Sequence, residues 1–122
     1  MNDILSYTTE QTVTPNESAL SMGSGDMEVF ATPAMVALME QAAMLAAKKL
    51  LQDGESSVGI EISTSHLKAS RIGSTIRATA TLEQQDGRRL KFRVEAYDGD
   101  TLIGEGSHTR FIVDKSRFLA KL

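Results

Sequence analysis

The chain contains no cysteine among its 122 residues. This absence excludes disulfide bonds, thiolate nucleophiles and metal sites built from cysteine ligands. Histidine occurs only at His66 and His108. Two distant histidines without cysteine do not make a metal-ligand set, so we expect no bound metal.

Long apolar runs are also missing, since none reaches the roughly 20 residues of a membrane-spanning helix. Residues 1–7 lack both the basic and the apolar region of a secretion signal. A glycine-rich phosphate loop is absent too, because Gly23-Ser24-Gly25 does not lie between a strand and a helix of the required kind. We therefore expect a cytoplasmic protein that does not bind membranes.

Composition and charge indicate a soluble globular domain, with 41% hydrophobic and 24% charged residues. The net charge of −3 argues against a dedicated nucleic-acid-binding protein. Residues 1–65 hold two basic and nine acidic residues, whereas residues 66–122 hold eleven basic and seven acidic ones. The basic half could meet an anionic ligand such as a phosphorylated cofactor, and a solvated strand face explains most of these residues equally well.

The strongest local signal is a nearly continuous apolar run over residues 34–47. Thr32 is a good N-cap and Pro33 suits the first helical position, so we predict a helix from about residue 33 to residue 51. This helix has no polar stripe. Most of its surface must therefore be covered, either by a sheet that wraps it or by a second subunit.

After residue 56 the apolar residues alternate with a period of two, which predicts four strands. Asp-Gly pairs at 86–87 and 98–99 lie between alternating runs and predict hairpin turns. Residues 11–14 have strand composition, residues 1–8 show no clear pattern, and residues 18–26 are predicted to form a mobile loop. A strand, a long helix and a four-stranded antiparallel meander predict one α+β domain over residues 1–122, with a sheet packed around the helix.

Glu40 and Gln41 interrupt the apolar run, and the carboxylate of Glu40 lies near its centre. A buried carboxylate is neutralised, paired with a cation or kept for chemistry. The helix offers Glu40 no neighbouring cation, so we favour a catalytic role, with a structural charge at a subunit interface as the alternative. Gln41 is interpreted as a polar interface residue.

The two histidines are interpreted differently. His66 shares the parity of the apolar residues in the strand at 58–62, so a regular strand points its ring toward the helix. A lone buried histidine is usually structural, but the isolated carboxylate on that helix makes catalysis an equally good explanation. His108 is interpreted as structural, because nothing in the sequence connects it to Glu40.

Helix capping alone explains Thr32. The start of the same helix nevertheless supplies free backbone N–H groups, which suit a developing oxyanion. Thr32 and Glu40 are eight residues apart, which corresponds to about 12 Å along a helix axis. One site can use both only if the substrate spans this distance or if two helices face each other in a dimer.

Four segments together resemble the fluoroacetyl-CoA thioesterase-like family of hotdog-fold thioesterases. They are residues 29–36 followed by Glu40, residues 58–59 with Ser65-His66, residues 87–92 and residues 104–112. The resemblance implies a long helix wrapped by an antiparallel sheet, assembled as a homodimer, with further pairing into tetramers left open. It also implies that Thr32, Glu40 and His66 correspond to the family's threonine, glutamate and histidine.

The resemblance implies an acyl-CoA thioesterase without a separate cofactor, because coenzyme A is part of the substrate. The start of the helix and Thr32 would polarise the thioester carbonyl. Glu40 would activate water or attack directly, and His66 would orient these groups or donate a proton. A non-catalytic acyl-CoA-binding module is the alternative, and a hotdog hydratase or dehydratase ranks below it.

Substrate recognition can be predicted only in outline. Lys68, Arg71 and Arg110 are candidates for binding the coenzyme A phosphates. The fluoroacetyl-CoA enzyme carries an aromatic lid before the helix, whereas residues 20–28 contain no aromatic residue. We therefore expect a general short or medium acyl group, carried by coenzyme A or by an acyl carrier protein.

Overall fold

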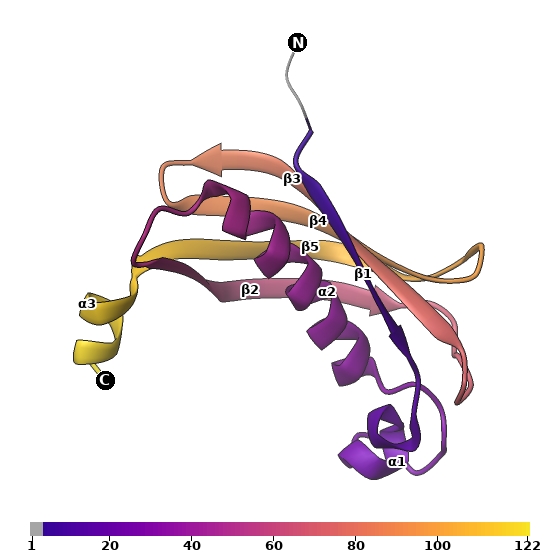
Figure 1. Ribbon diagram of the computed structural model, residues 1–122. Coiled ribbons are helices and arrows are strands. Elements are labelled where there is room, and N and C mark those ends of the chain that lie inside the picture. The colour runs from indigo at the N-terminus through magenta and orange to yellow at the C-terminus, as the bar shows by residue number, and fades with distance from the viewer. Residues whose placement is uncertain (1–3) are drawn as a thin grey trace.

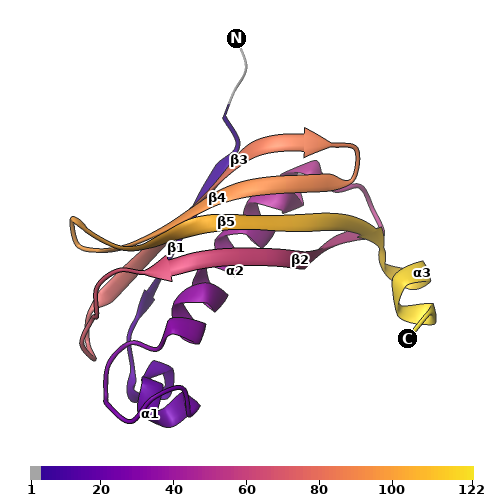
Figure 2. The ribbon, with the colours of Figure 1, turned by 180° about the vertical axis from the view of Figure 1, so that it is seen from behind.

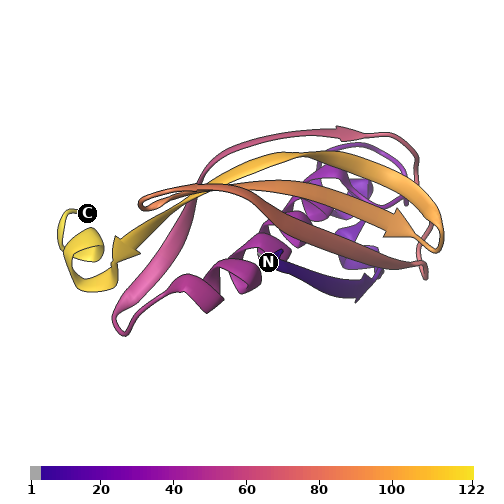
Figure 3. The same ribbon diagram turned by 90° about the horizontal axis from the view of Figure 1, so that it is seen from above.

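The computed structural model describes residues 4–122. One five-stranded antiparallel sheet packs against one long helix, α2 (Thr32–Ala47), and arches over it (Figures 1 and 3). The strands are β1 (Ser6–Thr12), β2 (Glu55–His66), β3 (Thr75–Asp86), β4 (Arg89–Asp98) and β5 (Thr101–Asp114). Short helical segments are η1 (Pro15–Glu17), α1 (Ala19–Met22), η2 (Lys48–Leu50) and α3 (Lys115–Ala120). The predicted α+β arrangement is therefore present.

The strand order in the sheet is β1-β3-β4-β5-β2. Strands β3, β4 and β5 form a meander, and its two turns contain Gly87 and Gly99 with φ angles of +59° and +60°. The prediction that β2 belongs to this meander was wrong, because β2 pairs with β5 and forms one edge of the sheet. Alternation identifies a strand but says nothing about which strand lies beside it.

The N-terminal part contains more regular structure than the sequence predicts. Residues 6–8 belong to β1, although their sequence shows no clear pattern, and residues 1–3 of that segment lie outside the described residues. Strand β1 is largely exposed and polar, so it lacks the alternation that reveals a buried strand. The segment predicted as a loop contains α1, which Ser18 caps at its start and Gly23 ends with a φ of +75°.

Helix α2 begins at Thr32, one residue earlier than predicted, and its N-cap is Ala31. The prediction that Thr32 caps this helix was wrong, so its hydroxyl is available for another partner. The helix ends at Ala47 and continues as η2, close to the predicted end. Among residues 4–122, no helix combines the length and apolar character needed to cross a bilayer.

The core lies between α2 and the concave face of the sheet, while the described helices leave the other face uncovered (Figure 2). Met35 and Met39 of α2 are fully buried against this face. A Cβ added to Gly104 of β5 would lie only 2.5 Å from the Met35 sulfur, so glycine at this position allows the helix to approach closely. Val36 and Met44, about one turn before and after Glu40 on α2, are apolar and only half-buried.

Candidate active site

The first group of predicted site residues meets where α2 begins beside the end of β2. Thr32 Oγ1 lies 2.8 Å from Nδ1 of His66, which is a hydrogen-bond distance. Phe30 packs edge-on against the imidazole, with 6.3 Å between the ring centroids. The predicted orientation of His66 toward the helix is therefore confirmed.

The imidazole of His66 has one nitrogen left to act on a ligand. Its Nε2 is buried and has no hydrogen-bond partner in residues 4–122. Burial lowers the pKa of His66, and the backbone of Lys68 only partly opposes this effect. A neutral imidazole accepts a proton at one nitrogen and donates at the other. Since buried polar atoms normally have a partner, the free Nε2 points to a ligand-binding role.

A cavity of about 290 Å³ opens beside this pair. Its lining comes from α1, from the segment that leads into the first residue of α2, and from the end of β2 with the loop after it: Ala19, Ser24, Val29, Phe30, Thr32, His66, Leu67, Lys68 and Ala69. The volume lies at the small end of the range for ligand pockets in proteins. The cavity therefore suits a small group rather than a complete coenzyme.

The second group surrounds Glu40, in the middle of α2. The Glu40 side chain is 43% exposed, so the prediction of a buried carboxylate was wrong. Its Oε2 lies 3.8 Å from Nη1 of Arg110 and 3.9 Å from Nε2 of His108. Helix α2 contains no basic residue, as expected, but Arg110 of β5 supplies a cation from the sheet.

The interpretation that nothing connects His108 to Glu40 was wrong. His108 and Arg110 lie on the concave face of β5, and both are buried. Gly59 of β2 faces Arg110 in the strand pairing. A Cβ added there would lie 2.7 Å from Glu40 Oε2 and 3.0 Å from His108 Cε1, so glycine leaves room for the carboxylate. The only sequence signal for this group was that His108 and Arg110 are two positions apart in one strand, which places them on the same face.

An irregularity in β2 explains why some of its residues do not face the helix as predicted. The pairing of β2 with β5 shifts between Gly59 and Glu61, as in a β-bulge. The shift reverses the parity, so Ile60 is 48% exposed instead of facing the helix with His66. Gly59 takes the inward position, and the predicted common face for the whole strand was wrong at Val58 and Ile60.

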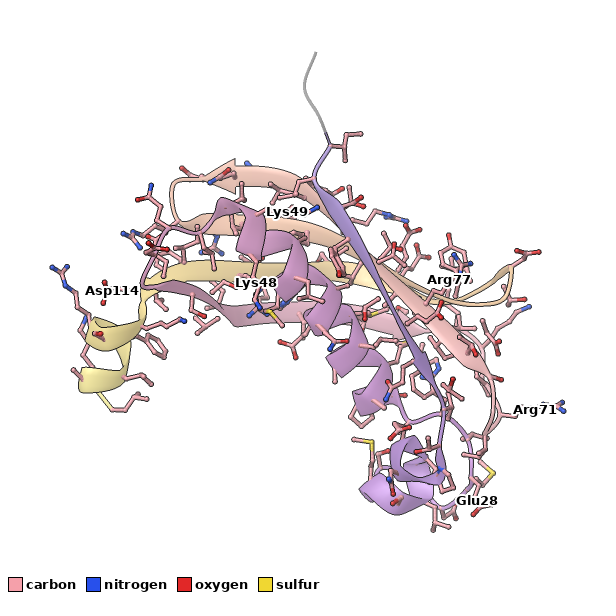
Figure 4. All side chains as sticks on the ribbon, viewed as in Figure 1. Glu28, Lys48, Lys49, Arg71, Arg77 and Asp114 are labelled. Carbon is pink, nitrogen blue, oxygen red and sulfur yellow. The ribbon has the colours of Figure 1, made fainter. Side chains whose placement is uncertain are left out.

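The residues predicted to bind phosphates lie in different places. Lys68 lines the cavity beside Thr32 and His66. Arg71 extends away from the protein, as Figure 4 shows. Arg110 is only 6% exposed and donates hydrogen bonds to Ser57, so it belongs to the Glu40 group. A phosphate-binding role for these three residues stays a prediction.

Comparison with known proteins identifies the family. The family model described as fluoroacetyl-CoA-specific thioesterase matches residues 13–116. The chain belongs to this thioesterase family. A curated fluoroacetyl-CoA thioesterase from Streptantibioticus cattleyicolor is 44% identical over 95 residues, which cover 78% of this chain and 68% of that protein. Membership confirms the predicted family and the predicted class of activity, thioester hydrolysis.

Solved structures of thioesterases share the fold over nearly the whole chain. The fluoroacetyl-CoA thioesterase FlK is 36% identical with a TM-score of 0.90, and the match covers 99% of this chain and 94% of that chain. A Thermus thermophilus member of the thioesterase superfamily is 30% identical with a TM-score of 0.90, covering 98% of this chain and 89% of that chain. The hotdog fold predicted for this thioesterase is confirmed.

Proposed function

We propose that the protein hydrolyses short or medium acyl-CoA thioesters, using Thr32 and His66 on one side of the thioester and Glu40 on the other. The observation that carries this proposal is the 2.8 Å contact between Thr32 and His66 beside a cavity, where the second imidazole nitrogen has no hydrogen-bond partner among residues 4–122. Family membership supplies the reaction class, and the contact supplies a place for the carbonyl.

A second copy of the chain completes the site in this proposal. Thr32 and Glu40 lie on one helix about 12 Å apart along its axis, and no hydrogen bond or ion pair joins them in residues 4–122. Strand β2 lies at an edge of the sheet and exposes Ile60, and the apolar residues Val36 and Met44 of α2 are only half-buried. Pairing of two β2 edges in a homodimer would cover these surfaces and bring Glu40 of one copy toward Thr32 of the other.

The proposed reaction needs no metal and no added cofactor. Backbone N–H groups at the start of α2 and the Thr32 hydroxyl polarise the thioester carbonyl. Glu40 removes a proton from water as its oxygen attacks the carbonyl carbon, or it attacks first and water then hydrolyses the resulting anhydride. The C–S bond breaks, the acyl group leaves as a carboxylate, and the thiolate of coenzyme A takes up a proton. His66 holds the Thr32 hydroxyl in place.

The cavity and its surroundings support the proposed substrate class. Its volume of about 290 Å³ accommodates a small acyl group, and no aromatic residue lies within residues 20–28 to select a particular one. Coenzyme A is the proposed carrier, because Lys68 lies at the cavity and a variant of FlK was crystallised with fluoroacetate and CoA. That variant is 35% identical to this chain, with a TM-score of 0.88 and coverage of 97% of this chain and 99% of that chain.

The test is release of free thiol from a panel of acyl-CoAs, from acetyl to decanoyl with phenylacetyl and fluoroacetyl members. Glu40→Gln should lower kcat at least about 100-fold on the best substrate, because it removes the base or nucleophile. Glu83→Gln makes the same change at an exposed position of β3, so it is the matched control and should retain activity.

Other outcomes separate the alternatives. Acyl-CoA binding by calorimetry with no thiol release would indicate a binding module. Hydration of an enoyl-CoA without thiol release would indicate a hydratase. A loss below about tenfold in Glu40→Gln would show that Glu40 is neither base nor nucleophile.

A further inference from the structure

The ring of His108 is held between two partners that fix its protonation. Its Nδ1 lies 2.8 Å from the carbonyl oxygen of Glu61, and its Nε2 lies 3.1 Å from Nη1 of Arg110. A carbonyl only accepts, so Nδ1 carries the hydrogen. A guanidinium only donates, so Nε2 carries none. His108 is therefore neutral and accepts a hydrogen bond from Arg110.

The surroundings of His108 agree with this neutral form. The side chain is only 1% exposed, and burial is the largest influence lowering its pKa. The charge of Arg110 lowers the pKa further, while the Glu61 carbonyl and the Glu40 carboxylate oppose both effects. The 3.9 Å approach of Nε2 to Glu40 is consequently not an ion pair, since the ring bears no charge.

Arg110 is fixed on its remaining sides by Ser57. Its Nε donates to the Ser57 hydroxyl at 2.8 Å, and its Nη2 donates to the Ser57 carbonyl at 2.9 Å. Its Nη1 donates to His108 and also faces Glu40 Oε2 at 3.8 Å. The guanidinium thus has one orientation, in which a positive N–H edge is directed at the carboxylate.

We propose that His108 is a positioning residue for hydrolysis: its neutral Nε2 holds Arg110, and Arg110 in turn holds the Glu40 carboxylate. This inference rests on the proposed function, because the position of Glu40 affects the rate only if Glu40 acts on the substrate. It also gives the β2 irregularity a role, since the shift between Gly59 and Glu61 lies where the Glu61 carbonyl meets the ring.

Two substitutions separate the two hydrogen bonds of the ring. In His108→Gln, the side-chain amide reaches the place of Nε2 and its oxygen can accept from Arg110. In His108→Asn, the amide reaches only the place of Nδ1, so it can donate to Glu61 but leaves Arg110 without its acceptor. We expect His108→Asn to lower kcat about tenfold with little change in KM, and His108→Gln to stay within about threefold of the unaltered protein.

A double-substitution cycle distinguishes positioning from general structural damage. If His108 acts through Glu40, then His108→Asn should have no further effect on kcat in a Glu40→Gln background. Equal losses in His108→Asn and His108→Gln, or a loss that persists in the Glu40→Gln background, would overturn the proposal. Should His108→Asn fail to fold, Ser57→Ala removes another bond to Arg110 and should lower kcat in the same Glu40-dependent way. An unchanged kcat in that variant would also overturn it.

The same assays show which proposal has failed. Absence of thiol release by the unaltered protein, or retention of activity by Glu40→Gln, would reject the proposed function itself. Activity that collapses in Glu40→Gln but remains in His108→Asn would reject only the positioning role of His108.

Discussion

The hydroxyl of Thr32 lies 2.8 Å from Nδ1 of His66, although the two residues are 34 positions apart in the chain. Helix α2 does not need this hydroxyl, because Ala31 occupies the N-cap position. The residue that resembled a helix cap in the sequence instead contacts His66, as the proposed function requires.

Thr32→Val tests this assignment, because valine keeps the shape of threonine without the hydroxyl. We expect kcat/KM to fall at least about tenfold, because valine can neither donate a hydrogen bond to the thioester carbonyl nor contact His66 through a hydroxyl. Thr32→Ser retains the hydroxyl and should keep most of the activity. The melting temperature should change little, whereas loss of a true N-cap would cost about 1 kcal/mol of stability. A destabilised but fully active Thr32→Val protein would contradict the assignment.

Gly59→Ala tests the space around Glu40. The added Cβ would lie 2.7 Å from Glu40 Oε2, so the carboxylate must move. We expect thiol release to fall at least about tenfold while the thermal transition is retained, because Gly59 does not have a positive φ. Ser65→Ala, on the opposite face of β2, is the matched control. Unchanged turnover in Gly59→Ala would show that the observed position of Glu40 is not the active one.

Lys68→Ala tests recognition of the coenzyme. Lys68 lines the cavity and carries a positive charge that can attract the phosphates of coenzyme A. Its loss should therefore raise KM for acyl-CoA about three- to tenfold. Thioesters of pantetheine lack the nucleotide phosphates, and their KM should not change. Lys91→Ala, on β4 away from the cavity, is a matched control for loss of one charge. An equal rise in KM for both kinds of thioester would assign Lys68 to acyl or pantetheine binding.

Local patterns in the sequence predicted the elements but not their long-range pairing. The apolar run gave α2, and the Asp-Gly turns gave the hairpins of β3, β4 and β5, because these signals depend on neighbouring residues. The place of β2 beside β5 depends on contacts between distant segments, which periodicity does not encode. The order of the sheet could therefore not be predicted from alternation.

In the candidate site, too, local features could be predicted from the sequence and contacts between distant segments could not. The inward orientation of His66 followed from parity, because β2 is regular from Glu61 to its end. The connection of Glu40 to His108 and Arg110 was missed, because it requires the register of β2 with β5 and the irregularity at Gly59. For Thr32 the local pattern predicts only capping, because a threonine before an apolar run has the same sequence signature in either role, and the catalytic role is implied by the family resemblance alone.

The pH dependence of stability should report His66, which is half-buried, and His108, which is buried. Folding lowers the pKa of both His66 and His108 below the ordinary value of 6.5, mainly through burial. Below pH 6.5 the unfolded chain therefore binds protons that the folded chain does not, and stability falls as the pH decreases toward the lowered pKa values. Their contribution is fully present above pH 6.5. Thermal unfolding between pH 8 and pH 5 should show a decline that begins near pH 6.5.

His108→Gln isolates one part of that decline, because glutamine does not titrate in this range and can still accept from Arg110. The fall in melting temperature between pH 7 and pH 5 should be smaller in His108→Gln than in the unaltered protein, and smaller again when His66→Gln is added. Both variants lose a group whose protonation favours unfolding. Their melting temperatures should therefore lie below that of the unaltered protein at pH 7 and come closer to it as the pH decreases. Parallel curves for all three proteins would mean that neither histidine is held neutral by folding.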